Sequence, residues 1–136
     1  MRIAPALAVV LLLAAPGSAL PAAVVAPPPA PSAVPAAPPY EADLLRLSEI
    51  LGAVHYLRQL CKADEGDIWR QQMEKLLETE SPDEARRARM VDRFNRGYDS
   101  YKSVYLSCTP AATESTQRYL EEGAKIAAEI TARYGK

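Results

Sequence analysis

The chain has 136 residues, of which 24% are charged and 49% hydrophobic, and a formal net charge of −1 at pH 7. This balance argues against a surface for nucleic acid or anionic membrane, because both depend on an excess of basic residues. Two cysteines and one histidine make a poor zinc-binding set. We therefore expect no metal, no cofactor and no nucleic-acid partner.

Residues 1–19 have the pattern of a secretory signal peptide. Arg2 supplies a positive charge, an uncharged apolar run extends from Ile3 to Ala15, and small residues up to Ala19 suit a signal peptidase. The run is too short to cross a bilayer, which needs about 20 apolar residues. The sequence predicts cleavage near Ala19, export to the periplasm and no membrane span in the mature chain. An uncleaved anchor is the less favoured alternative.

Residues 20–39 differ sharply in composition, with alanine, valine and eight prolines but no charge. Proline fixes φ and lacks an N–H donor, so we predict an extended, disordered linker. A proline-motif ligand is the alternative, although the basic residues that commonly flank such motifs are missing. The remaining residues, 40–136, are predicted to form one helical domain.

The first part of this domain has the apolar spacing of two helices. In the first helix, from about residues 40–43 to 61, apolar side chains recur every three or four positions, and Gly52 suggests a close helix crossing. A shorter second helix follows Asp67, a candidate N-cap. Its apolar face is predicted to consist of Trp69, Met73, Leu76 and Leu77.

Two prolines mark the starts of the third and fourth helices. Ser81 precedes Pro82 and Thr109 precedes Pro110, and a hydroxyl residue before proline is typical of a helix N-cap. The third helix is predicted to run from Pro82 to about Cys108, continuous across Gly97. Its buried stripe is predicted to be Val91, Phe94, Tyr98, Tyr101, Tyr105 and Cys108. The fourth is predicted to end before Gly135 and to turn inward Tyr119, Leu120, Ala124, Ile126, Ala127, Ile130 and Tyr134.

Short connections between helices favour antiparallel neighbours, so the predicted fold is all-α, an up-down four-helix bundle. The C-terminal ends of the first and third helices then meet, and Cys61 and Cys108 occupy those ends. We predict a disulfide between them, which closes a loop of about 48 residues and stabilises the fold by roughly 4 kcal/mol. A metal pair or a redox pair is less favoured, since no C-x-x-C motif is present.

No motif assigns a reaction, because the sequence contains no nucleophile elbow, zinc-protease, phosphate-loop or EF-hand pattern. His55 would need an orienting carboxylate such as Glu49 to act as a general base, and a histidine bonded to a neighbouring side chain is the simpler interpretation. The tyrosines of the third helix indicate a core with a wet rim, or a groove for a peptide, glycan or lipid head group. In the first case, partners for their hydroxyls would be Asn95, Arg58 or Arg70.

Several segments together resemble a family of exported alphaproteobacterial proteins with two well-separated cysteines and no assigned activity. The resemblance rests on Leu51-Gly52, His55-Tyr56-Leu57-Arg58, Cys61, Trp69-Arg70, Met73, Phe94-Asn95-Arg96-Gly97-Tyr98, Tyr105 and Cys108. It covers about residues 44–134. It implies a periplasmic setting, a disulfide and a domain of unknown function, and it transfers no catalytic residue.

We therefore predict a non-enzymatic periplasmic domain that binds or supports a cell-envelope partner, which is an unidentified protein or ligand. Its candidate binding surface comprises polar and aromatic residues beyond the needs of a four-helix core: His55, Arg58, Trp69, Arg70, Asn95, Arg96 and Tyr98. The alternative is a hydrolase or lyase of cell-wall fragments that uses His55 and a carboxylate. A third hypothesis is a chaperone-like or structural envelope factor.

Overall fold

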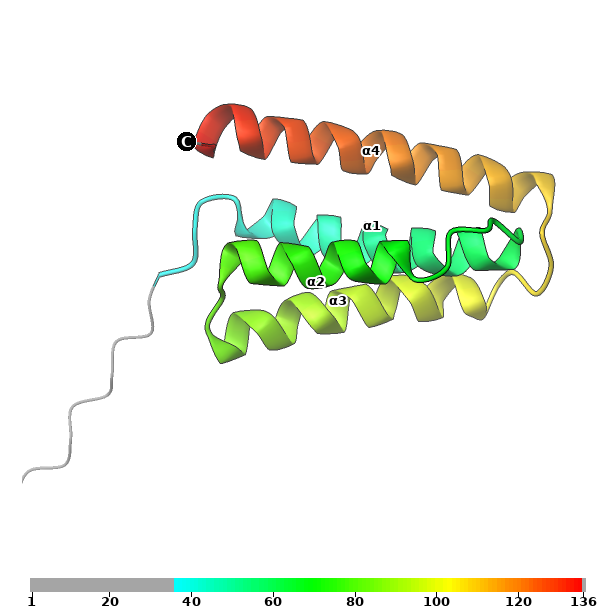
Figure 1. Cartoon of the computed structure of the whole chain (residues 1–136), viewed down its shortest axis with the longest axis horizontal. Coiled ribbons are helices and arrows are strands. Elements are labelled where there is room, and N and C mark those ends of the chain that lie inside the picture. The colour runs from blue at the N-terminus through cyan, green and yellow to red at the C-terminus, as the bar shows by residue number, and fades with distance from the viewer. Residues whose placement is uncertain (1–35, 136) are drawn as a thin grey trace, which may run out of the picture. The chain divides into compact units, whose positions relative to one another are not determined.

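The computed structural model describes residues 36–135, so the predicted signal peptide and most of the predicted linker lie outside the described residues. These residues form the helices α1 (Glu41–Leu60), α2 (Ile68–Glu80), α3 (Glu84–Lys102) and α4 (Pro110–Tyr134). Successive helices run in opposite directions, joined by short connections (Figure 1). The prediction of an all-α fold with four packed helices is confirmed.

Helix α1 is the centre of the bundle, because α2, α3 and α4 all pack against it. Its sequence is apolar around most of its circumference, and Leu44, Val54 and Leu57 are each at most 1% exposed. A helix of this kind needs cover on every side. The three outer helices provide that cover, but each neighbouring pair of them leaves a groove with α1 at its floor.

Two glycines allow α1 and α3 to cross closely. A Cβ atom at Gly52 would clash with the carbonyl group of Phe94, and one at Gly97 would clash with the carbonyl group of Glu49. Both obstacles are backbone atoms, so no side-chain movement could relieve them. Gly52 therefore marks the close crossing that the sequence suggested, and α3 continues through Gly97 as predicted.

The N-terminal end of α3 differs from the prediction. Its N-cap is Asp83, whose carboxylate accepts a hydrogen bond of 2.8 Å from the Arg86 N–H. Ser81 instead ends α2 in the left-handed conformation, with a φ of 42°. Asp83 is well suited to the cap because its negative charge also complements the helix dipole. Asp67 precedes α2 as predicted, but its side chain makes no capping hydrogen bond.

The prediction that the third helix runs to about Cys108 is also wrong. Helix α3 ends at Lys102, and residues 103–109 form a loop. In this loop Val104 and Leu106 are 68% and 87% exposed, so neither side chain is buried in the bundle. The loop is held by a hydrogen bond from the Tyr56 hydroxyl to the Tyr105 carbonyl.

The stripe of α3 that packs against α1 overlaps the predicted one only in part: Phe94 belongs to both, and the predicted Tyr98, Tyr101 and Tyr105 are half-buried. It is centred on Met90, which is completely buried, on Phe94 and on Gly97, which touches the backbone of α1. Val91 is 38% exposed, and Cys108 lies exposed in the loop. Gly97 was overlooked as a core position because a residue without a side chain carries no apolar signal.

Helix α4 begins as predicted, with Thr109 as N-cap and a hydrogen bond of 3.1 Å from the Ala112 N–H to its hydroxyl. It ends before Gly135, also as predicted. Its buried positions are mostly small residues, namely Ala112, Ser115, Thr116 and Gly123. Of the predicted inward residues, Tyr119, Leu120, Ile126 and Ile130 are half-buried, whereas Ala124, Ala127 and Tyr134 are exposed. The prediction failed in part because α4 packs chiefly against α1 and leaves apolar surface uncovered.

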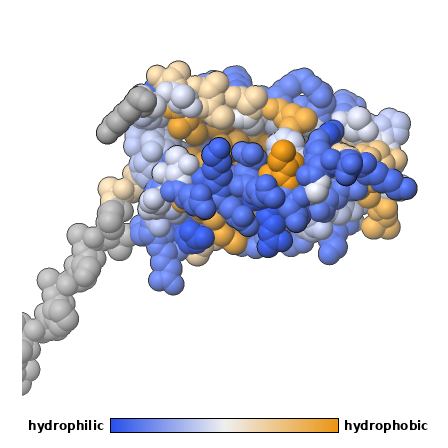
Figure 2. Space-filling view, viewed as in Figure 1, coloured by the Kyte–Doolittle hydropathy of each residue, from blue (hydrophilic) through white to orange (hydrophobic). Residues whose placement is uncertain are grey.

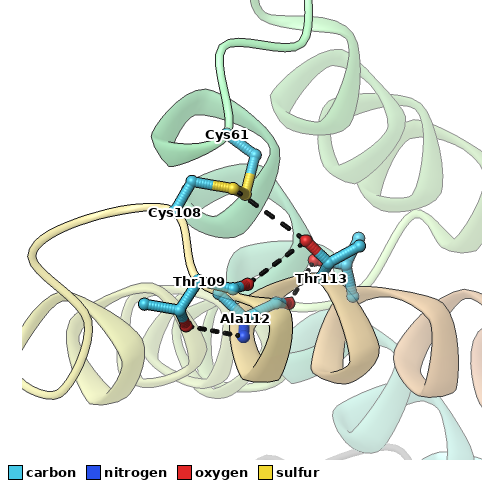
Figure 3. The surroundings of a disulfide bond; sticks show 6 residues. Cys61, Cys108, Thr109, Ala112 and Thr113 are labelled. Atoms are coloured by element: carbon cyan, nitrogen blue, oxygen red, sulfur yellow. Dashed lines mark hydrogen bonds between the residues drawn. A yellow bond between two sulfur atoms is a disulfide. The ribbon is translucent and has the colours of Figure 1, made fainter.

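Cys61 and Cys108 form the predicted disulfide, with their Cα atoms 4.8 Å apart (Figure 3). The bond joins the residue that follows α1 to the loop before α4. Thr109 begins the next helix immediately afterwards, so the disulfide ties the end of α1 to the start of α4. Within residues 36–135, no helix combines the length and apolar character that crossing a membrane requires.

Candidate functional site

His55 lies on α1 and lines the groove between α2 and α3. It is 6% exposed, and its ring centroid lies 5.9 Å from that of Phe94 and 5.8 Å from that of Tyr98. Its Nδ1 atom is buried and has no hydrogen-bond partner among the described residues. The expectation of a histidine bonded to a neighbouring side chain is therefore wrong for this atom.

Burial is the main cause that lowers the pKa of His55 below its ordinary value. The Asp67 carboxylate opposes this shift, and the Arg70 guanidinium adds to it. A lowered pKa keeps the imidazole neutral at neutral pH. The floor of the groove thus holds an uncharged ring with one unsatisfied nitrogen.

The groove above this ring has a volume of about 520 Å³, and we call it the His55 groove. Its apolar lining comes mainly from the buried Met73 and Leu77 of α2 and from the half-buried Phe94 of α3. Its exposed or half-buried lining carries polar and charged groups: Gln59, Asp67, Arg70, Glu74, Arg87, Asn95 and Tyr98. This size falls within the range of small-ligand sites, about 300–1,000 Å³. The lining suits a ligand that has both apolar and hydrogen-bonding groups.

Four of the seven residues of the predicted binding surface come together in this groove: His55, Arg70, Asn95 and Tyr98. Arg70 is exposed and makes only a long ion pair of 3.9 Å with Glu74, so its guanidinium remains accessible to a ligand. Asn95 is also exposed. The polar groups of the two walls can therefore both face a molecule that lies above His55.

Tyr98 differs from the other tyrosines near the bundle's centre. The Tyr101 hydroxyl donates a hydrogen bond of 2.9 Å to the Tyr119 hydroxyl, and burial raises the pKa of Tyr101. Tyr98 packs edge-on against Tyr56, with centroids 5.2 Å apart, and its hydroxyl bonds to no described residue. The Tyr56 hydroxyl donates to the backbone of Tyr105, and no tyrosine hydroxyl of the described residues bonds to the predicted partners Asn95, Arg58 and Arg70.

Arg58 and Trp69 belong to a separate cluster at the start of α2. The Glu65 carboxylate accepts hydrogen bonds from the Arg58 guanidinium, one of them 2.9 Å long, and from the Trp69 indole N–H at 2.7 Å. These bonds, that of Arg58 first, lower the pKa of Glu65 to about 2. Trp69 lines the groove between α2 and α4 and is absent from the lining of the His55 groove.

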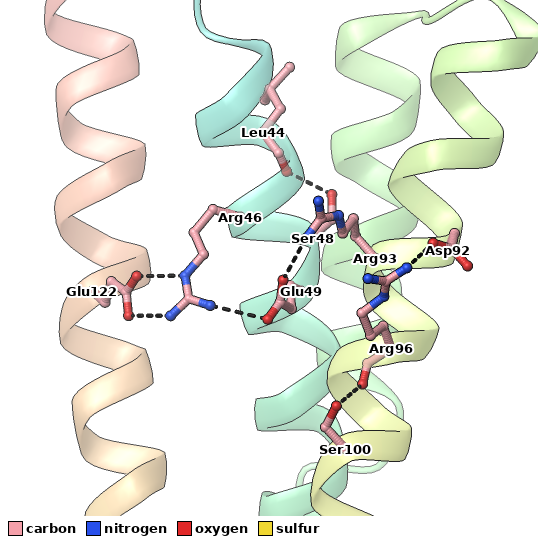
Figure 4. Close-up of polar contacts among 9 residues, drawn as sticks. All are labelled: Leu44, Arg46, Ser48, Glu49, Asp92, Arg93, Arg96, Ser100 and Glu122. Carbon is pink, nitrogen blue, oxygen red and sulfur yellow. Dashed lines mark hydrogen bonds and ion pairs between the residues drawn. The ribbon is translucent and has the colours of Figure 1, made fainter.

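Arg96, the remaining residue of the predicted surface, lies on the exposed side of α3 (Figure 4). Its guanidinium pairs with the Asp92 carboxylate at 3.2 Å, one turn earlier on the same helix. Exposed ion pairs of this spacing contribute only about 0.3–0.5 kcal/mol. Arg96 is therefore part of a solvated helix face and does not line the His55 groove.

Glu49, the carboxylate considered as a partner for His55, is engaged elsewhere (Figure 4). It accepts hydrogen bonds of 3.2 Å from both Arg46 and Arg93. Arg46 also binds the two carboxylate oxygens of Glu122 at 2.7 and 2.9 Å. These ion pairs link α1 to α3 and α4, and they leave no carboxylate of this set to orient the histidine.

Four polar residues of the His55 groove were not assigned to a site from the sequence: Gln59, Asp67, Glu74 and Arg87. Helical spacing contained a usable signal, since Asp67, Arg70 and Glu74 follow one another at steps of three and four. Such a polar row on a bundle helix also occurs on ordinary solvated faces. The signal becomes specific only when the facing row on α3 is known.

Comparison with known proteins identifies the domain but not its activity. Residues 39–134 match the family described as "Protein of unknown function (DUF2385)". No curated protein and no solved structure matches the chain. Among residues 36–135, no three side chains of histidine, cysteine, aspartate or glutamate come together as a metal site.

Proposed function

We propose that this chain, which belongs to the DUF2385 family of proteins of unknown function, is an exported binding domain whose His55 groove holds a cell-envelope ligand. The observation that carries this proposal is the buried Nδ1 atom of His55, which has no partner among the described residues. A buried polar atom without a hydrogen bond costs about 1–3 kcal/mol. An apolar residue at this position would avoid that cost. A ligand or bound water that reaches the groove floor would offset it by supplying the missing hydrogen bond to Nδ1.

The lining of the groove favours a peptide segment of an envelope protein as the ligand. Its exposed residues carry both signs of charge, with Asp67, Arg70 and Glu74 along the α2 wall and Arg87 on the α3 wall. A peptide presents backbone donors and acceptors together with apolar side chains, which matches polar walls above an apolar base. A purely anionic or purely apolar ligand would leave half of these groups without partners.

Export to the periplasm is part of the proposal. The Cys61–Cys108 disulfide is a bond that persists in oxidising compartments and is rare in the cytosol. Residues 1–19 have the charge and apolar pattern of a signal peptide. Both observations support the same compartment, although they come from different parts of the chain.

Site-specific photo-crosslinking tests this proposal. The residue p-benzoyl-phenylalanine would replace Asn95 in one version of the exported protein and Arg96 in the other. Arg96 is a matched control, because it follows Asn95 directly but lies outside the groove. We expect an adduct with an envelope component from position 95 only, lost when Arg70→Ala and Tyr98→Ala are added. No adduct at position 95, or equal labelling at both positions, would contradict the proposal.

A hydrolase or lyase of cell-wall fragments remains the alternative, favoured by the presence of Asp67 and Glu74 in the same groove as His55. Neither carboxylate is hydrogen-bonded to the histidine, so the orienting contact that a general base needs is not formed. Turnover of soluble peptidoglycan fragments by the wild-type protein, abolished by His55→Ala, would favour the enzyme over the binding domain.

A further inference from the structure

A second groove lies between α2 and α4, and the proposed function does not use it. Two cavities of about 470 and 270 Å³ share Leu47, Leu51 and Trp69 in their linings, and together we call them the Trp69 groove. Figure 2 shows apolar surface between α4, along the top of the view, and the polar outer face of α2 below it. This groove is separate from the His55 groove, which has none of these three residues in its lining.

The inner cavity of the Trp69 groove lies directly over the core of the bundle. Its floor includes Ile50 and Val54, which are 3% and 0% exposed, and its far wall is formed by Leu120 and Gly123 of α4. The outer cavity adds Ile68, a large apolar residue that is 43% exposed. The path from surface to core is thus apolar for most of its length.

Small residues on α4 keep this space open. Gly123 brings α4 close to α1, since a Cβ atom there would lie 3.3 Å from Ile50 Cγ2. Ala124 lines the inner cavity and Ala127 the outer one. Larger side chains at either alanine would project into space that the present sequence leaves free.

The charge at the groove is restricted to one residue. Lys75 is the single charged residue that lines the two cavities, and it forms no ion pair with any described residue. It lines the outer cavity only, beside the polar residues Gln72 and Thr79. An amphiphile with an apolar tail and one negative head would complement this arrangement.

The position of Trp69 is set by side chains outside the groove. Its indole N–H donates to the Glu65 carboxylate at 2.7 Å, and Arg58 holds that carboxylate in turn. With its polar edge bound, the tryptophan presents an apolar ring to both cavities. Two residues of the predicted binding surface are therefore part of this groove's structure: Trp69 lines it, and Arg58 helps to fix the position of Trp69 through Glu65.

We infer that the Trp69 groove binds a single fatty acyl chain with a carboxylate head, that is, a free fatty acid. The inner cavity has room for roughly nine groups of about 30 Å³ each, the volume of a water molecule in the liquid. This suits a thin hydrocarbon chain, whereas an α-helix is about 10–12 Å across with its side chains. The carboxylate head would remain in the outer cavity and bind Lys75.

Tryptophan fluorescence tests the inference directly, because Trp69 is the chain's only tryptophan. The probe is 11-bromoundecanoate, whose bromine quenches indole at close range, used below its micelle concentration. We expect saturable quenching by the brominated acid and none by undecanoate itself. Lys75→Ala should weaken the carboxylate probe about tenfold and leave the affinity for the neutral 11-bromoundecanol unchanged.

Variants of α4 separate binding in the groove from adsorption elsewhere. Ala124→Phe with Ala127→Phe should fill the groove and weaken the probe at least tenfold. Ala128→Phe is the matched control, since Ala128 is exposed on the same helix but lines neither cavity. Urea unfolding would establish that all three proteins are folded. Quenching that is absent, or that is equal in the filled and control variants, would overturn the inference.

Two further outcomes would also overturn it by identifying another occupant. Light scattering that shows a dimer, dissociated by Ala124→Phe with Ala127→Phe but not by the probe, would assign the groove to a second copy. Quenching by vesicles of brominated phosphatidylcholine, without quenching by the free acid, would assign this face to a membrane surface.

Discussion

Replacing Gly97 by alanine should destabilise the bundle, although alanine is the better helix former. A Cβ atom at this position would lie 2.9 Å from the Glu49 carbonyl carbon and 3.0 Å from the Ala53 nitrogen, and closer still to the Glu49 oxygen. All of these are backbone atoms of α1, so the two helices must separate to admit the methyl group. The same reasoning applies to Gly52, where the obstacle is the backbone of Phe94.

The size of the effect follows from two opposing contributions. Alanine in place of glycine favours a helix by about 1 kcal/mol. Overpacking a core costs typically about 1–3 kcal/mol, and a rigid backbone obstacle places this site at the upper end. We therefore expect Gly97→Ala to lower the free energy of unfolding by about 2 kcal/mol. For a domain of this size, the midpoint of thermal unfolding would fall by about 8–16 °C.

Urea unfolding followed by far-UV circular dichroism, with the disulfide intact, would measure this change. Gly123→Ala is the control, because it makes the same substitution in a buried position of α4. There the new methyl group meets only side chains, the nearest being Ile50 Cγ2 at 3.3 Å. The change in stability should stay within about 1 kcal/mol in either direction. A Gly97→Ala protein as stable as wild type, or less affected than Gly123→Ala, would refute the close-crossing argument.

Three other predictions concern the disulfide and two titrating side chains. Replacing both Cys61 and Cys108 by serine should lower the free energy of unfolding by roughly 4 kcal/mol, which urea titration with and without reductant would check. Because the folded pKa of Glu65 is lowered to about 2 from 4.5, its contribution is complete above pH 4.5 and lost as the pH falls towards 2. Glu65→Gln should therefore be less stable than wild type by about 1 kcal/mol at pH 7 and equal to it near pH 2, with a shifted Trp69 emission. The folded pKa of His55 is lowered below 6.5, so as the pH drops below 6.5 the unfolded chain takes up a proton first and the free energy of unfolding should fall. Urea midpoints at pH 7.5 and 5.5 should show this loss of stability, and His55→Phe should reduce the loss.

The parts of the fold that were predictable depend on local chemistry. Thr109 before Pro110 identified the start of α4, because capping and proline geometry act within one turn of helix. The pairing of Cys61 with Cys108 followed from the antiparallel order of the helices and required no knowledge of their packing. Gly52 was a usable signal because a glycine inside a helix is unfavourable unless close packing compensates for it.

The parts that were not predictable depend on how the helices surround α1. The aromatic row of α3 suggested the buried stripe, but the stripe that packs against α1 also passes through Met90 and Gly97. The Met90 side chain is completely buried, and at Gly97 the α1 backbone leaves no room for a side chain. Likewise, the predicted surface contained residues from two grooves and a solvated face, since spacing along one helix does not say which neighbour faces it. The sequence placed His55 and Trp69 together in one candidate binding surface, yet they line different grooves.

The three grooves around α1 differ in the hydrogen-bond partners of their polar groups, and this difference motivates the two ligand proposals. In the groove between α3 and α4, the Tyr101 hydroxyl donates to the Tyr119 hydroxyl, and the Glu49 carboxylate is held by Arg46 and Arg93. In the other two, the Nδ1 atom of His55 and the ammonium group of Lys75 lack partners among the described residues. A bundle in which three helices surround a fourth must leave such gaps, so their existence alone implies nothing. The two proposals therefore rest on particular groups, the Nδ1 atom of His55 and the ammonium group of Lys75, and these two groups call for ligands of different chemistry.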